Sequence, residues 1–106
     1  MHARLSRFAG LPPERIDETL RQFEEEQLPV LERQSGYRGV MVMVNRGTGQ
    51  AAAITLWETQ DDLRESAKVA DRARAAAVKT AQPSREPVVD SYEILVIRQL
   101  KGPRAG

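Results

Sequence analysis

The feature that most constrains the fold is a pair of apolar runs, residues 40–44 and 51–57, separated by a short polar break. The break contains Asn45, Gly47 and Gly49. Glycine supplies the positive φ that a short loop between two strands needs. The sequence therefore predicts a β-hairpin at the middle of the chain.

Both faces of this hairpin are apolar. Side chains alternate across a strand, so Met41 and Met43 share one face while the valines between them share the other. The second strand repeats the pattern, with Ile54 on one face and Trp57 on the other. A two-stranded unit of this kind needs a cover on both sides. Helices can cover one face, and a second subunit is the most economical cover for the other.

A short first strand is predicted at residues 3–8, where small or apolar residues alternate with polar ones. Phe8 falls on the same face as Arg4 and Ser6. This mixed face has two interpretations, the wall of a cavity or a strand end that emerges into solvent.

The first helix is predicted to open at the two prolines that follow Leu11, because the first helical turn tolerates proline. Ile16, Leu20 and Phe23 form a single apolar stripe along it. Pro29 should kink or break the helix just before it. The acidic residues fall mainly on the opposite side, where they are expected to form a solvated face and not a metal site.

After the hairpin, Thr59 and Asp62 form a variant of the capping box, which predicts a second helix from there to about residue 79. The helix is rich in alanine, so it should pack closely but weakly, and it can be broken into two pieces. Residues 82–87 contain two prolines and are predicted to be a linker. Residues 88–97 are rich in β-branched side chains and predict a last strand long enough to overhang the sheet.

Composition limits the protein to one domain, predicted at residues 1–98, followed by a basic tail at 99–106. With one Trp, two Tyr and two Phe the core is thin, which favours association with a second copy. The 16 basic and 15 acidic residues balance, which argues against nucleic-acid or membrane binding. There is no cysteine, and no long apolar run appears, so a cytoplasmic protein is expected.

The order strand–helix–strand–strand–helix–strand predicts an α+β, ferredoxin-like fold, a four-stranded antiparallel sheet with both helices on one face. Three segments resemble the dimeric α/β-barrel family of antibiotic-biosynthesis-monooxygenase-like (ABM-like) proteins. They are Gln-Ser-Gly-Tyr-Arg-Gly at 34–39, Leu-Trp-Glu-Thr at 56–59 leading into Asp-Asp-Leu, and Tyr-Glu-Ile-Leu-Val at 92–96. The resemblance extends over about residues 3–97.

The resemblance implies a homodimer in which two sheets face each other as a barrel, with a pocket in each subunit between helices and sheet. The family includes cofactor-free monooxygenases acting on polyketide anthrones or quinols, haem-degrading enzymes and polyketide cyclases. Its haem-degrading members use an asparagine on the first strand and a histidine on the second helix. Here the first strand has no asparagine and the only histidine is His2. No cofactor and no metal are therefore expected, and a small aromatic molecule is the expected ligand.

The sequence offers three sets of candidate residues. The predicted ligand-pocket residues are Phe8, Phe23, Trp57 and Leu63. The candidate catalytic residues are Trp57, which stands where the family keeps a tryptophan beside the cavity, Arg72, Tyr37 and Tyr92. The predicted dimer contacts are Met41, Met43, Tyr92 and Ile94. Like Arg72, Arg74 on the same helix and Arg4 or Arg7 on the first strand could stabilise an oxyanion. Each candidate has a plainer alternative: the tryptophan is a core residue, the arginines are surface charges, and the tyrosines are caps on the core.

Three functions stay open at this stage. The first is a small cofactor-independent monooxygenase, or a related enzyme, acting on an aromatic, quinone-like or polyketide-like molecule. The second is a non-catalytic dimeric ligand-binding or interaction module of the same fold. The third is a cyclase or isomerase that needs a positioned acid–base pair such as Glu58 with an arginine or tyrosine. An open cavity beside Trp57 with a buried Arg or Tyr favours chemistry, whereas a cavity filled by Leu, Met and Phe side chains excludes it.

Overall fold

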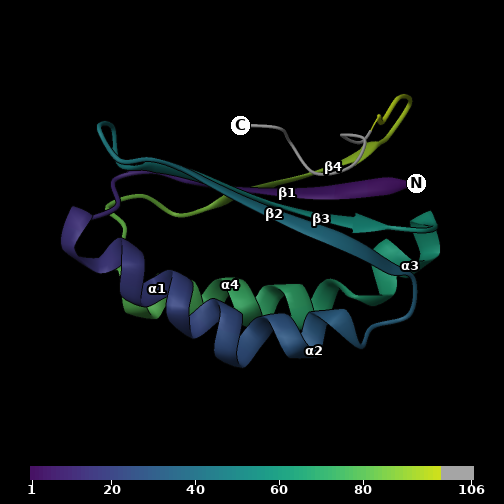
Figure 1. The fold of residues 1–106 in the computed structure, drawn as a ribbon, viewed down its shortest axis with the longest axis horizontal. Coiled ribbons are helices and arrows are strands. Elements are labelled where there is room, and N and C mark those ends of the chain that lie inside the picture. The colour runs from purple at the N-terminus through teal and green to yellow at the C-terminus, as the bar shows by residue number, and fades with distance from the viewer. Residues whose placement is uncertain (99–106) are drawn as a thin grey trace, which may run out of the picture.

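The computed structural model describes residues 1–98, which form a sheet with a layer of helices on one face (Figure 1). The strands are β1 (His2–Phe8), β2 (Tyr37–Asn45), β3 (Gln50–Trp57) and β4 (Val88–Glu93). They pair antiparallel in the order β2-β3-β1-β4. The predicted α+β ferredoxin-like fold is confirmed. The basic tail predicted at 99–106 lies outside the described residues.

The central hairpin is confirmed, with β2 and β3 joined by residues 46–49. The Asn45 side-chain oxygen accepts hydrogen bonds from the backbone N–H groups of Gly47 and Thr48, at 3.0 and 3.1 Å. Gly49 has φ +73°, and a Cβ there would lie 3.0 Å from the carbonyl oxygen of Leu11. Glycine is therefore needed for the turn and for its close contact with the start of the helical layer.

The first helical segment is interrupted where Pro29 predicts a break. It consists of η1 (Pro13–Arg15), α1 (Ile16–Gln22), the π-helical turn η2 (Phe23–Gln27) and α2 (Leu28–Glu32). The backbone N–H of Leu28 donates to the carbonyl of Phe23, five residues earlier. A π-turn adds one residue to the helical repeat and so rotates the apolar stripe around the helix axis. Leu31 is therefore buried at a position that the helical spacing from Ile16 does not predict.

The second helical segment consists of α3 (Gln60–Glu65) and α4 (Ala67–Ala81). The predicted cap is confirmed, because Thr59 Oγ1 accepts from the Asp62 backbone N–H at 3.0 Å. The interruption falls at Ser66, which is buried and donates its hydroxyl to the carbonyl of Leu63 at 2.8 Å. No helix of the described part of the chain is long and apolar enough to cross a membrane.

Two clusters of buried side chains hold the layers together. One contains Leu31, Trp57, Leu63 and Ala73, and the other contains Leu11, Ile16 and Ala81. The first cluster joins the end of β3 to α2, α3 and α4, since each of these elements contributes one of its residues. Trp57 is 0% exposed and is the largest of the fully buried side chains within residues 1–98.

The second face of the sheet is covered by no helix of residues 1–98 (Figure 1). The predicted division of the hairpin is confirmed: Val42 and Val44 lie on the helix side, and Met41 and Met43 point the other way. Met41 is 56% exposed. Tyr92 of β4, which pairs with the outward-facing Ala3, is also exposed on this outer face.

The last strand is shorter than predicted. The pattern at residues 88–97 predicts one continuous strand, but β4 ends at Glu93. Its ladder is formed with β1, whose first residue, His2, pairs with Glu93. The final bond of this edge runs from the Ile94 N–H to the Met1 carbonyl at 2.9 Å. Beyond it Leu95, Val96 and Ile97 are exposed and irregular, because no described backbone is left to pair with them.

Replacing Trp57 with alanine tests the importance of its cluster. Truncating a buried tryptophan removes contacts and leaves a cavity, so Trp57→Ala should lower the free energy of unfolding by about 3–5 kcal/mol in urea denaturation. Arg72→Ala on the exposed side of α4 is the control and should change it by less than about 0.5 kcal/mol. A loss below about 1 kcal/mol for the tryptophan variant would contradict its structural role.

Candidate functional site: an apolar pocket lined with hydrogen-bond donors

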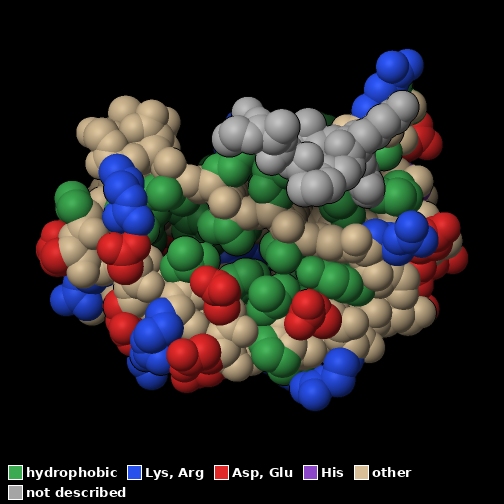
Figure 2. All heavy atoms as spheres, in the orientation of Figure 1, with side chains coloured by type: hydrophobic (Ala, Val, Ile, Leu, Met, Phe, Trp, Pro, Cys, Tyr) green, Lys and Arg blue, Asp and Glu red, His purple; other side chains and the backbone are tan. Residues whose placement is uncertain are grey.

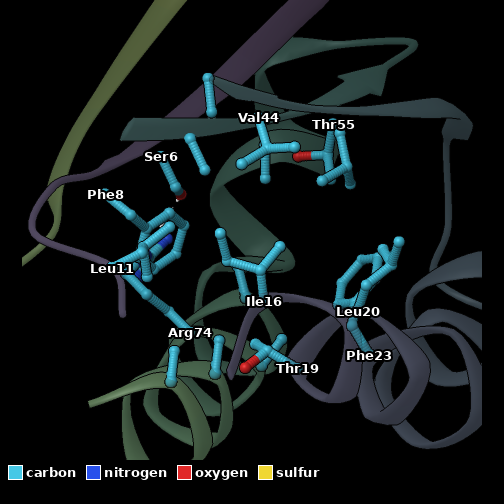
Figure 3. Close-up of a pocket in the computed structure, with 18 of the residues that line it drawn as sticks. Ser6, Phe8, Leu11, Ile16, Thr19, Leu20, Phe23, Val44, Thr55 and Arg74 are labelled. Carbon is cyan, nitrogen blue, oxygen red and sulfur yellow. Dashed lines mark hydrogen bonds between the residues drawn. The ribbon is translucent and has the colours of Figure 1, made fainter. Parts of the chain in front are cut away.

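A pocket of about 180 Å³ opens between the helices and the inner face of the sheet (Figure 3). Figure 2 shows hydrophobic side chains gathered along the cleft between the two layers. The apolar wall consists of Phe8, Leu11, Ile16, Leu20, Phe23, Leu31, Val42, Val44 and the alanines of β3 and α4. The volume is similar to the roughly 150 Å³ apolar cavity that admits benzene. The cavity is therefore open and of a size that admits a small aromatic molecule.

Arg74 reaches from α4 across the pocket toward β1 (Figure 3). Its Nε donates to Ser6 Oγ at 3.2 Å and its Nη1 donates to Asp71 Oδ1 at 2.9 Å. The side chain is only 14% exposed, whereas that of Asp71 is largely in solvent. Nη2 makes no hydrogen bond to any residue in the described range and keeps some solvent contact. It is a donor available to a ligand.

Arg4 is a second guanidinium in the wall and is 6% exposed. It donates from Nη1 to Ser66 Oγ at 3.1 Å and from Nη2 to the Leu63 carbonyl. Its Cζ lies 5.9 Å from the centre of the Trp57 ring. All these partners are neutral. Burial, and then the charge of Arg74, lower the pKa of Arg4 from its usual value.

Three hydroxyl groups complete the polar part of the wall, and that of Thr19 donates to the Arg15 carbonyl at 2.7 Å. Ser6 accepts from Arg74, and Thr55 Oγ1 accepts from the indole Nε1 of Trp57 at 2.9 Å. A hydroxyl that accepts one bond still has its O–H to donate. Thr55 stands directly opposite Arg4 in the β1–β3 ladder. The polar side chains of the pocket wall therefore present donors and no carboxylate.

Arg46 belongs to the hairpin loop and is the third arginine of the wall. Its Nη2 donates to Asp17 Oδ1 of α1 at 2.6 Å, so the pair links the loop to the helical layer. The hydrogen bond from Arg46 lowers the pKa of Asp17. Both side chains are largely exposed, and a pair of this kind contributes little to stability.

The four predicted pocket residues divide into two pairs. Phe8 and Phe23 line the pocket, where they stand near opposite ends in Figure 3. Trp57 and Leu63 lie next to it in the buried cluster and are absent from its wall. Trp57 reaches the pocket through its hydrogen bond to Thr55 and its contact with Arg4, both of which line the wall.

The three other candidate catalytic residues lie outside the pocket wall, as Trp57 does. Arg72 is exposed on α4, and Arg74 enters the pocket in its place, because helical residues two apart point in different directions. Tyr37 packs edge-on against Trp57 with ring centres 5.9 Å apart, and burial followed by the nearby Glu32 raises its pKa. Tyr92 is exposed on the outer face of the sheet.

Sequence reasoning missed Thr55, Ser66 and Arg46. Thr55 could have been found, since it stands two residues before Trp57 on the same strand face. Ser66 gave no signal beyond the expected break in the helix. Glu58, the carboxylate that a cyclase would require, is exposed and pairs with Arg38 at 2.7 Å. It is not part of the pocket wall.

The donor set of the pocket does not fit haem. Haem iron is held by His, Cys, Met or Tyr side chains, and the wall contains none of them. Among residues 1–98 there is also no group of three or more His, Asp or Glu side chains placed to hold a metal ion.

The fold is that of the ABM-like proteins, as the sequence resemblance implied. No protein-family model matches the sequence, and no curated protein matches it. Among solved structures, the monooxygenase from the gene ActVA-Orf6 of Streptomyces coelicolor, in complex with nanaomycin D, is similar with a TM-score of 0.71 and 10% identity over 97% of this chain and 92% of that one.

Two further structures support the same fold. Rv0793 from Mycobacterium tuberculosis has a TM-score of 0.68 and 16% identity over 92% of this chain and 98% of its own. A mutant of SnoaB, a cofactor-independent oxygenase from Streptomyces nogalater, has a TM-score of 0.65 and 14% identity over 95% of this chain and 97% of its own. At these identities the likeness establishes the fold.

Replacing Arg4 with methionine tests whether its buried charge serves the fold. A buried charge without an opposite charge is costly, and an apolar side chain of similar volume removes that cost. The Leu63 carbonyl keeps the hydrogen bond from Ser66. Arg4→Met should therefore leave the urea midpoint unchanged or raise it. A loss of more than about 2 kcal/mol, as expected when a buried network is broken, would show that the guanidinium holds the structure together.

Proposed function

We propose that the chain is a small cofactor-independent monooxygenase that acts on an aromatic, quinone-like or polyketide-like molecule bound in this pocket. The proposal rests on the polar side chains of the wall, where Arg74, Ser6 and Thr55 offer hydrogen-bond donors within an otherwise apolar lining. Two proteins of the same fold support it: one is described as a cofactor-independent oxygenase, and the other is a monooxygenase in complex with nanaomycin D.

The chemistry requires a substrate that is itself electron-rich. A ring CH₂ beside a carbonyl loses a proton to give an enolate, whose carbon forms a bond to dioxygen, and the resulting hydroperoxide breaks its O–O bond and leaves a ketone. The net change is CH₂ + O₂ → C=O + H₂O. Donors aimed at the enolate oxygen stabilise the charge as it develops. Phe8 and Phe23 would provide the water-poor surroundings that strengthen these bonds.

The proposal includes a homodimer formed through the outer face of the sheet. Met41, Met43 and Tyr92 are exposed there, together with Val88. Ile54 continues the apolar surface on β3, and the exposed ion pair between Arg7 and Asp90 interrupts it at β1 and β4. A second copy would cover this face with the same face of its own, giving the two-sheet barrel that the resemblance implies. Ile94, at the end of β4, would lie at the edge of that contact.

A non-catalytic, dimeric ligand-binding module is the second candidate. It is favoured by one observation: the ionisable side chains in the pocket wall are all arginines, so the wall contains no general base. The same pocket could therefore hold a ligand without transforming it. A cyclase is less well supported, because Glu58 lies outside the wall and is paired with Arg38.

Oxygen uptake with anthrone and hydroquinone substrates separates these two candidates. The enzyme should consume one O₂ per substrate oxidised, and Arg74→Gln should lower kcat by about 10²–10³, the effect of removing one oxyanion donor. Arg72→Gln, two positions away on the exposed side of α4, is the matched control and should keep full activity. Binding without oxygen uptake would favour the ligand-binding module.

Sedimentation velocity tests the dimer. Met43→Asp places a charge without a partner in the proposed apolar contact and should convert the dimer to a monomer at micromolar concentration. Arg72→Asp, on the opposite side of the molecule, should remain a dimer. If Met43→Asp also remains a dimer, the outer face is not the contact surface.

A further inference from the structure

We infer that the pocket binds its ligand as a preformed organic anion, the conjugate base of an acidic phenol or enol, whose proton goes to solvent and not to the protein. This inference deepens the proposed function, on which it rests, by naming the substrate class of the same pocket. It is drawn from the charges and donors of the wall and from what the wall lacks.

The charges around the pocket are predominantly positive. β1 contributes Arg4, the hairpin loop contributes Arg46, and α4 contributes Arg74. The lining residues of β2, β3, η2 and α2 are uncharged. Only two carboxylates of the described residues pair with these arginines: Asp17 of α1 with Arg46 and Asp71 of α4 with Arg74. Arg4 forms no salt bridge within residues 1–98. Burial of Arg4 and the charge of Arg74 lower the pKa of Arg4 more than the nearby charge of Asp71 raises it. The charge of Arg4 is therefore stabilised by neutral hydrogen-bond partners and by the face of Trp57, and by no paired carboxylate of the described residues.

A guanidinium that is 6% exposed and has no paired carboxylate is unfavourable in an empty, apolar pocket. An anion placed beside Arg4 and Arg74 would offset that cost and also receive the open Nη2 of Arg74. The hydroxyl groups of Ser6 and Thr55 favour an anion as well, since both oxygens already accept a bond and have a proton left to donate. A neutral ketone or ether would leave the charge of Arg4 without a counterpart.

No group of the wall can take the ligand's proton. The ionisable side chains of the lining are arginines, which stay protonated in proteins. The two carboxylates that pair with them, Asp17 and Asp71, hold arginine hydrogen bonds and are largely exposed to water. Proton release to solvent is therefore the route left to the ligand. It restricts the substrates to molecules that ionise readily on their own.

The positive pocket should assist this ionisation. A guanidinium a few ångströms from an acid lowers the acid's pKa by about 1–3 units, because it favours the charged form. Bound phenols or enols should show the same shift. The pKa shift equals the logarithm of the ratio between the affinities of the ionised and the neutral ligand. The anion must then bind about 10–1,000 times more tightly than the neutral acid.

Spectroscopic titration of a bound chromophoric phenol tests the inference. The probe is 4-nitrophenol, whose phenolate absorbs at longer wavelength than the phenol, with 4-nitroanisole as the non-ionisable analogue of similar shape. On the unaltered protein the bound probe should have a pKa about 1–3 units below that of the free probe. The anisole should bind at least about tenfold more weakly. Equal affinity for the two compounds, or a raised pKa, would overturn the inference.

Variants and proton counting complete the test. Arg74→Gln and Arg4→Met should each lose most of the pKa shift while keeping the native circular dichroism spectrum, and Arg72→Gln should keep the shift. At a pH midway between the pKa of the bound probe and that of the free probe, calorimetry in two buffers of different ionisation enthalpy should find net proton release, from about half a proton per phenol for a shift of one unit to nearly one for a shift of three. Phenolate formation without proton release would mean that a protein group is the base, which contradicts the inference.

The two proposals fail separately. A full pKa shift of the bound phenol, without oxygen consumption when anthrone or hydroquinone is the substrate, would reject the monooxygenase and leave anion binding supported. Oxygen uptake with no shift in the bound phenol would reject anion selection and leave the oxygenase supported. The phenol measurement does not depend on turnover, so each result is interpretable alone.

Discussion

The packing of Trp57 against both helical segments is the contact on which the rest of the structure depends. The ring is completely buried at the end of β3, where it meets Leu31 and Leu63 from the two segments that cross the sheet. Tyr37 approaches it from β2 with its edge, and Arg4 of β1 lies over its face. With so few aromatic residues in the chain, one large side chain provides much of the buried area that holds the layers together.

This position makes Trp57 an organiser of the pocket without being part of its wall. Its indole N–H holds the Thr55 hydroxyl, and its face packs against the guanidinium of Arg4. Both groups belong to the wall. A change at Trp57 would therefore affect ligand binding by moving two donors, as well as by weakening the core. A loss of ligand binding in a Trp57 variant would therefore have two causes, a weaker core and displaced donors. Variants of Arg4 and Arg74 test the donors directly.

Much of the fold could be predicted from the sequence because its signals are local. The hairpin, the break before Pro29 and the cap at Thr59 each depend on a few neighbouring residues. The end of β4 could not be predicted, since it is set by the length of β1 and not by the residues of β4 itself. The sequence also could not show which of Arg72 and Arg74 faces the pocket, because the two faces of an alanine-rich helix differ little in hydrophobicity.

The site was predicted only in part for a related reason. The alternation of Arg4, Ser6 and Phe8 on one strand suggested a cavity wall, and these residues do line the pocket. What the sequence could not show is that α4 brings a second arginine to the same place, or that the carboxylate paired with it faces outward. Charge compensation is a property of three-dimensional neighbours. A buried arginine without a paired opposite charge is unfavourable for the fold alone, so its presence beside an open cavity is best understood as the requirement of a negatively charged ligand.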